Sequence, residues 1–121
     1  MGRKKHVWKK IHEVITLHKP TVIGIETLFA EKNVKTVMGI AEVIGIIRSC
    51  AYQYHIPLYT FTPLQIKSAI TGNGRATKNE VEKMTRLLIQ VPETKMKDDE
   101  LDAIAVALTT SAYFKNITPV E

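Results

Sequence analysis

The stretch "VIGIETLFAEKN", residues 22–33, decides the fold class, because an apolar run leads directly into a carboxylate. Residues 21–25, "TVIGI", are apolar and mostly β-branched, as expected of a strand covered on both faces. Glu26 then falls at the carboxyl end of that strand, the edge of an α/β sheet where ligands bind. From these residues Glu26 is either a solvated strand end, which is the commoner case, or the first ligand of a metal site.

Helices and a second strand are expected around this segment. Apolar positions at helical spacing predict a helix over residues 5–18 and a long one over residues 33–55. Residues 56–62 read as a second strand, and a helix that connects two strands implies parallel pairing. Further helices are predicted from Pro63, over 81–89 after a "TKNE" capping box, and over 98–114 with Asp98 as N-cap. The pattern indicates one α/β domain spanning residues 1–121.

The predicted helix 33–55 is apolar on nearly all sides. A helix of this kind is buried on more than one side. In a chain of 121 residues we therefore expect one face to pack on the sheet and another on a partner subunit, which predicts a homodimer through helix 33–55.

The composition favours an intracellular protein with an anionic partner. The net charge is +5, with Lys and Arg spread along the chain, so nucleic acid is a better candidate partner than a membrane. Cys50 is the only cysteine, which excludes an internal disulfide and a thiolate metal cluster. Since no apolar run is long enough to span a membrane and no signal peptide is visible, we expect a cytoplasmic protein without membrane partners.

Three carboxylates form the candidate metal site: Glu26, Asp99 and Asp102. Asp99 and Asp102 are three residues apart on the last predicted helix, so they point the same way, among residues of its packing face. Oxygen ligands with few histidines favour Mg²⁺ or Mn²⁺ over zinc, and two such ions can promote in-line attack of water on a phosphodiester. The alternative also remains open, because acidic residues at a helix start commonly serve the helix macrodipole.

A glycine-rich basic loop follows the second strand and the short helix. "GNGRATK", residues 72–78, carries Arg75 and Lys78, with Lys67 just upstream, so its amides and cations could approach a phosphate. By itself the loop is more often only a flexible turn before a capped helix. Phe29 is a candidate for stacking on an unpaired base, the alternative being a buried loop anchor.

Taken together, four blocks resemble the RuvC family of Holliday-junction resolvases, in the same order. They are "IETLFAEKN", "AEVIGIIRSCA", "TFTPLQIKSAITGNGRATKNEV" and "DDELDAIAVALTT". The resemblance covers nearly all of residues 7–113, and its G-N-G-R-A-x-K and D-x-x-D-A-x-A motifs are specific.

The resemblance implies an RNase H-like fold and a homodimer that nicks symmetric strands of a four-way DNA junction with two Mg²⁺ or Mn²⁺ ions. It matches Glu26, Asp99 and Asp102 to three of four active-site carboxylates and Phe29 to the aromatic residue at the junction centre. Lys67 and Lys78 match lysines near the scissile phosphates, so that with Arg75 they form the expected DNA-binding set. A partnership with the RuvA–RuvB branch-migration complex is implied in the same way.

The sequence departs from the family pattern at its front. The family begins with a strand reading "I-L-G-I-D-P-G", whose aspartate is the fourth ligand, and no D-P-G occurs in this chain. We therefore expect an N-terminally truncated fold with about two parallel strands, flanking helices and an open sheet edge that invites pairing with another chain. Three functions stay open: a resolvase with weak or lost activity, a non-catalytic junction- or DNA-binding module, and an RNase H-like nuclease with another substrate.

Overall fold

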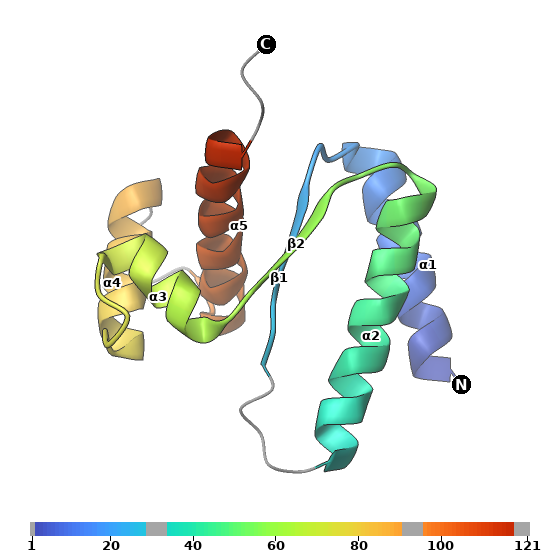
Figure 1. Ribbon diagram of the computed structural model, residues 1–121, viewed down its shortest axis with the longest axis horizontal. Coiled ribbons are helices and arrows are strands. Elements are labelled where there is room, and N and C mark those ends of the chain that lie inside the picture. The colour runs from blue at the N-terminus through green and yellow to red at the C-terminus, as the bar shows by residue number, and fades with distance from the viewer. Residues whose placement is uncertain (1, 29–33, 91–95, 118–121) are drawn as a thin grey trace.

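A computed structural model describes residues 2–28, 34–90 and 96–117. Figure 1 shows two strands between the helix pair α1–α2 on one side and α3, α4 and α5 on the other. None of the helices in these ranges is long and apolar enough to cross a membrane. The elements, in chain order, are α1 (Gly2–His18), β1 (Ile23–Glu26), α2 (Val34–Gln53), β2 (Leu58–Phe61), α3 (Pro63–Thr71), α4 (Lys78–Ile89) and α5 (Asp98–Ile117).

The two strands pair in parallel, as the intervening helix predicts. The register runs from Ile23 opposite Leu58 to Glu26 opposite Phe61. Glu26 is the last residue of β1, one residue beyond the predicted strand, and the next amide, Thr27 N, still donates to Phe61 O at 2.8 Å. The ladder therefore fixes the backbone on both sides of Glu26.

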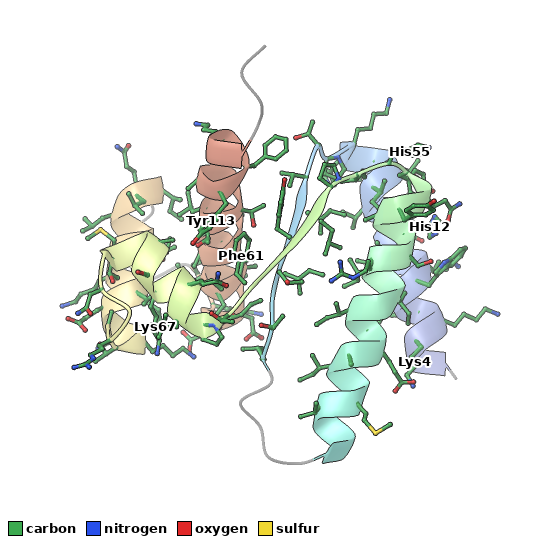
Figure 2. The ribbon with its side chains drawn as sticks, viewed as in Figure 1. Lys4, His12, His55, Phe61, Lys67 and Tyr113 are labelled. Atoms are coloured by element: carbon green, nitrogen blue, oxygen red, sulfur yellow. The ribbon has the colours of Figure 1, made fainter. Side chains whose placement is uncertain are left out.

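The main core lies between β2, α3 and α5. Its fully buried members are apolar and come from all three elements: Phe61, Ile66, Ile70, Ala105 and Val106. Figure 2 shows Phe61 beside Tyr113 of α5, and their ring centroids are 5.0 Å apart. This packing holds the start of α3 and the first half of α5 against the carboxyl end of the sheet.

Gly24 lets α5 approach the backbone of β1 closely. A Cβ built on Gly24 would lie 2.8 Å from Thr110 Cβ and 3.0 Å from Thr110 Cγ2, closer than such atoms can approach without a shift. Thr110 is itself buried, and its hydroxyl donates to Val106 O at 2.7 Å. Only glycine therefore fits at this position without displacing α5.

The starts of α3 and α4 are each fixed by a capping box. Thr62 accepts from Gln65 N while the Gln65 side chain accepts from Thr62 N, and Thr77 and Glu80 make the same pair of bonds. The second box places the start of α4 at Lys78, three residues before the predicted Val81.

The start of α5 also differs from the expectation. Asp98 lies inside the helix and is not its N-cap: the Leu101 amide donates to the carbonyl oxygen of Lys97, and Glu100 accepts from Lys97 N at 3.2 Å. The helix thus begins one residue earlier than a cap at Asp98 would allow.

The long helix α2 divides its apolar residues between two directions. Four of them face β1 across a hollow: Ile40, Val43, Ile44 and Ile47. On another side Met38 and Tyr52 are 60% and 83% exposed. One face of α2 is therefore turned toward the sheet, as predicted. A second face points outward, and none of the described residues covers it.

Candidate active site

Four of the predicted functional side chains line one small cavity at the carboxyl end of β1. The cavity measures about 320 Å³, and Glu26, Lys67, Lys78 and Asp102 lie in its wall. Each comes from a different element, namely β1, α3, α4 and α5. Apolar residues of α3, α4 and α5, with Leu28 just after β1, complete the lining: Leu28, Pro63, Ile66, Val81 and Ala105.

Local structure explains why these groups converge. Glu26 ends β1, and Asp102 lies about one turn into α5, which packs on β1 through the Gly24–Thr110 contact. Pro63 and Lys78 are the first residues of α3 and α4, so the N-terminal ends of both helices border the cavity. Helix N-termini carry partial positive charge and free N–H groups, which favours an anion there.

The electrostatics of the cavity act most clearly on Glu26. Burial and the neighbouring negative charge of Asp102 raise the pKa of the Glu26 carboxyl above its ordinary value, and the ammonium groups of Lys67 and Lys78 oppose this. The upward influence dominates, so the folded protein disfavours the charged form of Glu26, first through burial and then through the charge of Asp102 beside it. A cation placed between them would restore the balance.

We predict that Glu26→Gln stabilises the metal-free protein near neutral pH, with a melting temperature a few degrees higher. The folded protein holds a proton on Glu26 more firmly than the unfolded chain does, because its pKa is raised. The contribution of Glu26 to the free energy of unfolding is therefore present at low pH and is lost as the pH rises through the folded-state pKa. Melting curves in EDTA at pH 3.5 and pH 7 should show a difference between the two proteins only at the higher pH.

Glu13→Gln is the matched control, since Glu13 is an exposed carboxylate on α1 outside the cavity. It should leave the melting temperature unchanged at both pH values. A melting temperature of Glu26→Gln below that of the parent protein at pH 7 would contradict the claim that burial disfavours the charged Glu26 carboxylate.

Asp99 does not join the cavity lining. It is exposed on the first turn of α5, so the expectation that packing residues surround it is wrong. Within the residues that the structure describes, no group of three or more His, Cys, Asp and Glu side chains is placed to hold a metal. The structure therefore brings together a carboxylate pair, Glu26 and Asp102, rather than all three predicted groups.

The glycine-rich loop is ordered by its own hydrogen bonds. Gly72 ends α3 with φ 78°, Asn73 Oδ1 accepts from Arg75 N at 2.9 Å, and Asn73 O accepts from Ala76 N at 3.0 Å. The Arg75 side chain is exposed and does not line the cavity, whereas Lys78, three residues on, does. Phe29 lies outside the described residues.

Sequence reasoning did not anticipate the part played by Gly24 or by the apolar wall of the cavity. The Thr62–Pro63 helix start was a usable signal for the wall, because it places the first turn of α3 directly after β2. Gly24 offered no comparable signal, since glycine within an apolar strand has several common explanations.

Comparison with known proteins decides the family. The family model described as crossover junction endodeoxyribonuclease RuvC matches residues 1–110. The chain belongs to the RuvC family. Among curated RuvC proteins, that of Caldicellulosiruptor saccharolyticus is 41% identical over 106 residues, covering 88% of this chain and 64% of the relative. The Pseudothermotoga lettingae protein is 36% identical over 116 residues, covering 96% and 71%.

Solved structures agree with this assignment. Thermus thermophilus RuvC superposes with a TM-score of 0.84 at 26% identity, covering 96% of this chain and 69% of that one. A second structure, T. thermophilus RuvC in complex with Holliday junction substrate, gives the same score and covers 98% and 73%. The predicted α/β, RNase H-like fold class is thereby confirmed. The chain spans 64% and 62% of the lengths of two curated RuvC relatives.

Proposed function

We propose that this chain is a Holliday-junction resolvase, a metal-dependent endonuclease that nicks symmetric strands of a four-way DNA junction in the cytoplasm. The observation that carries the proposal is the shared cavity of Glu26, Asp102, Lys67 and Lys78 in a member of the RuvC family. The names of the curated relatives and the junction bound to a solved RuvC supply the reaction and the substrate.

The carboxylate pair fits a divalent cation. Two oxygen-bearing side chains, Glu26 and Asp102, face one cavity without His or Cys in its lining, and burial together with the charge of Asp102 raises the pKa of Glu26. Mg²⁺ is commonly held by one or two carboxylates together with substrate phosphates and water, and Mn²⁺ accepts the same oxygen ligands. We propose Asp99, about one turn ahead of Asp102, as a further ligand recruited when the phosphate binds. Two ions per site remain a prediction.

Bound in this way, the cation would supply Lewis-acid activation of the phosphate and of an attacking water. Glu26 and Asp102 would fix its position relative to the sheet edge. Lys67 and Lys78 would bind the non-bridging phosphate oxygens and offset the negative charge that grows in the transition state. The N-termini of α3 and α4 would add their partial positive charge from the same side of the cavity. Arg75, exposed on the adjoining loop, is proposed to bind a neighbouring phosphate of the DNA backbone.

A homodimer through α2 would give the two cuts that a symmetric junction requires. The outward face of α2 carries Met38 and Tyr52, which are 60% and 83% exposed, with Ala41, Gly45 and Ser49 in the same exposed stripe. Small residues between two large apolar ones allow two helices to approach closely. The stacking function of Phe29 and the partnership with RuvA–RuvB are further predictions of the family resemblance.

A non-catalytic junction-binding module is the second candidate, and one observation favours it. The cavity in the described residues holds two carboxylates, whereas the family resemblance implies four. A module of this kind would keep the lysines, the basic loop and the dimer face, and would bind junctions without nicking them.

The deciding experiment mixes the purified chain with a synthetic four-way junction, labelled on each strand in turn, in Mn²⁺. We expect nicks on one opposed pair of strands and no cleavage of a linear duplex of the same sequence. Binding without nicks, at any Mn²⁺ concentration, would favour the module. No preference for the junction over the duplex would contradict both candidates.

Lys67→Gln combined with Lys78→Gln tests the phosphate contacts of the cavity. Each lost lysine–phosphate contact should lower the slope of log affinity against log salt by about 1, because one fewer counterion is released. Fluorescence anisotropy with a labelled junction at several salt concentrations measures this slope. The control is Lys83→Gln, which changes an exposed lysine of α4 outside the cavity and should leave the slope unchanged. If Lys83→Gln lowered the slope as much as the double variant does, the cavity lysines would not be specific DNA contacts.

A further inference from the structure

The net positive charge of the chain is concentrated in α1. This helix holds five lysines and arginines and one acidic residue, Glu13, so it carries +4 of the chain's net charge of +5. Elsewhere in the chain, acidic residues balance nearly all the lysines and arginines. The first turn of α1 contains Arg3, Lys4 and Lys5 and no acidic residue, although cations at a helix N-terminus oppose the macrodipole. Helix stability does not explain this cluster, whereas an anionic partner does.

Two lysines of α1 are free to meet such a partner. Lys5 and Lys9 are exposed, and no carboxylate of the described residues pairs with either of them. In contrast, Lys4 pairs with Glu42 of α2 at 2.7 Å. Lys5 and Lys9 are four residues apart, so they lie on one face of the helix, about one turn from each other.

A shallow groove follows α1 beside these lysines. It measures about 740 Å³, and its lining comes entirely from α1 and from Lys19, directly after the helix. The lining includes Lys9 and Trp8, and Glu13 is its single carboxylate. Lys5, one turn before Lys9, extends the cationic surface toward the start of the helix. We name Lys5, Trp8, Lys9 and Lys19 the α1 basic face.

Trp8 gives this face an aromatic surface in a fixed position. The Trp8 side chain is 48% exposed, and its ring centroid lies 4.0 Å from that of His12. His12 is held in turn, because its Nδ1 lies 2.7 Å from the hydroxyl oxygen of Tyr54. An indole has an N–H donor as well as an apolar ring, so beside lysines it can donate to a phosphate oxygen while the ring covers a sugar.

The start of α1 lies at the same end of the sheet as the candidate active site. Lys4 and Glu26 line one hollow, between α2 and β1. Figure 2 shows Lys4 and Lys67 on opposite sides of the two strands, both toward the end where β1 finishes. At 1.5 Å per residue α1 is about 26 Å long, which matches about seven or eight base-pair steps of a duplex. The helix is therefore long enough to follow DNA through most of a helical turn.

We propose that the α1 basic face binds the phosphate backbone of one duplex arm of the junction, outside the cavity. The proposal rests on the proposed function for the identity of the ligand, DNA, and not on nicking. A membrane surface fits less well, because the main apolar face of α1 is turned inward: Val7 lines the hollow beside β1, and Ile15 is 4% exposed. Phosphate contacts of this kind add affinity that does not depend on DNA sequence.

The fluorescence of Trp8 tests the proposal on the unmodified chain. Trp8 is the only tryptophan, so its emission reports on this face alone. The full chain is titrated in EDTA with a labelled linear duplex of about 20 base pairs, which is longer than α1. Duplex anisotropy measures binding, and acrylamide quenching measures the exposure of Trp8. We expect quenching to weaken about twofold at saturating duplex, because a wet protein–DNA interface covers the ring from one side.

The same protection of Trp8 should appear in the cavity variant, Lys67→Gln combined with Lys78→Gln, once the duplex is saturating. Those lysines lie in the cavity wall and not in the α1 groove. Protection that persists in this variant separates the α1 basic face from the cavity.

Salt dependence measures the phosphate contacts themselves. Lys5→Gln combined with Lys9→Gln should lower the slope of log affinity against log salt by about 2, one for each lost contact. The matched control is Lys83→Gln combined with Lys115→Gln, which removes the same charge from exposed lysines of α4 and α5 and should leave the slope unchanged. All four side chains are exposed, so both double variants should melt at the temperature of the parent protein.

Three results would overturn the proposal. One is acrylamide quenching of Trp8 that stays unchanged while the duplex binds, and another is an equal loss of slope in the two double variants. The third concerns lipid, because Leu17 in the groove is 76% exposed. Vesicles containing phosphatidylserine that shift Trp8 emission to shorter wavelength, where the duplex gives no protection, would assign the face to a membrane.

The outcomes also distinguish this proposal from the proposed function. A chain that binds no DNA at all would overturn both. Binding or nicking of junctions with Trp8 left unprotected would overturn the α1 basic face alone.

Discussion

Gly24→Ala is expected to lower the free energy of unfolding by about 3 kcal/mol, near the upper end of overpacking effects. The new methyl group would fall inside the envelope of the Thr110 side chain, 2.8 Å from its Cβ, and Thr110 is buried on a helix that packs on β1. Relief requires α5 to move away from the sheet. Since Asp102 is on that helix, the carboxylate pair should separate as well. Urea denaturation measures the change in stability.

Two further variants isolate the contact between Gly24 and Thr110. Thr110→Ala removes the hydroxyl that the new methyl group meets first, so the double variant should recover part of the loss, as expected for residues in contact. Gly45→Ala, in α2 with open space around the added carbon, should stabilise the protein by roughly 0.5–1 kcal/mol. A stability loss of similar size in Gly24→Ala and Gly45→Ala would contradict the close approach of α5 to β1.

Glu26→Gln and Asp102→Asn are each expected to slow junction nicking by about 10³-fold or more, equivalent to roughly 4 kcal/mol of transition-state stabilisation. Each change keeps the shape of the side chain but removes a negative charge that would hold the cation. Single-turnover nicking of a labelled junction at saturating protein measures the rate. Junction binding should be retained, because neither variant removes a lysine or a helix N-terminus from the cavity.

Other acidic residues of α5 serve as internal comparisons. Asp98→Asn changes a carboxylate in the first turn of α5, one turn ahead of Asp102, that does not line the cavity, so nicking should stay within about twofold of the parent rate. Asp99→Asn should slow nicking by less than Asp102→Asn, because Asp99 is exposed in the absence of DNA. If Asp98→Asn were as damaging as Asp102→Asn, the charge of the helix start rather than the position of Asp102 would explain the loss.

Much of the fold could be predicted because it follows local patterns. Strand residues around Ile25, the connecting helix and the capping pair Thr77–Glu80 each depend on neighbours in the sequence, and parallel pairing follows from the connection. Boundaries were less certain, because tertiary hydrogen bonds decide them. The bond from Thr27 N to Phe61 O extends the ladder past Glu26, and no local pattern predicts it.

The candidate site was predictable in its members but not in its geometry. Spacing placed Asp99 and Asp102 on one side of α5, yet exposure depends on how that helix is rotated against β1, which the Gly24–Thr110 contact sets. The sequence separation of Lys67 and Lys78 from Glu26 gave no geometric reason to place the three side chains together. They line one cavity only because α3 and α4 pack on α5.

The central claim is that Glu26 and Asp102 together hold the catalytic cation, and Mn²⁺ binding tests it without depending on activity. Electron paramagnetic resonance can follow free Mn²⁺ during titration of the parent chain, Glu26→Gln, Asp102→Asn and the control Asp98→Asn. We expect the two cavity variants to bind Mn²⁺ about tenfold more weakly than the parent, and Asp98→Asn to bind it equally well. The same affinity in all four proteins would contradict the assignment of this cavity as the metal site.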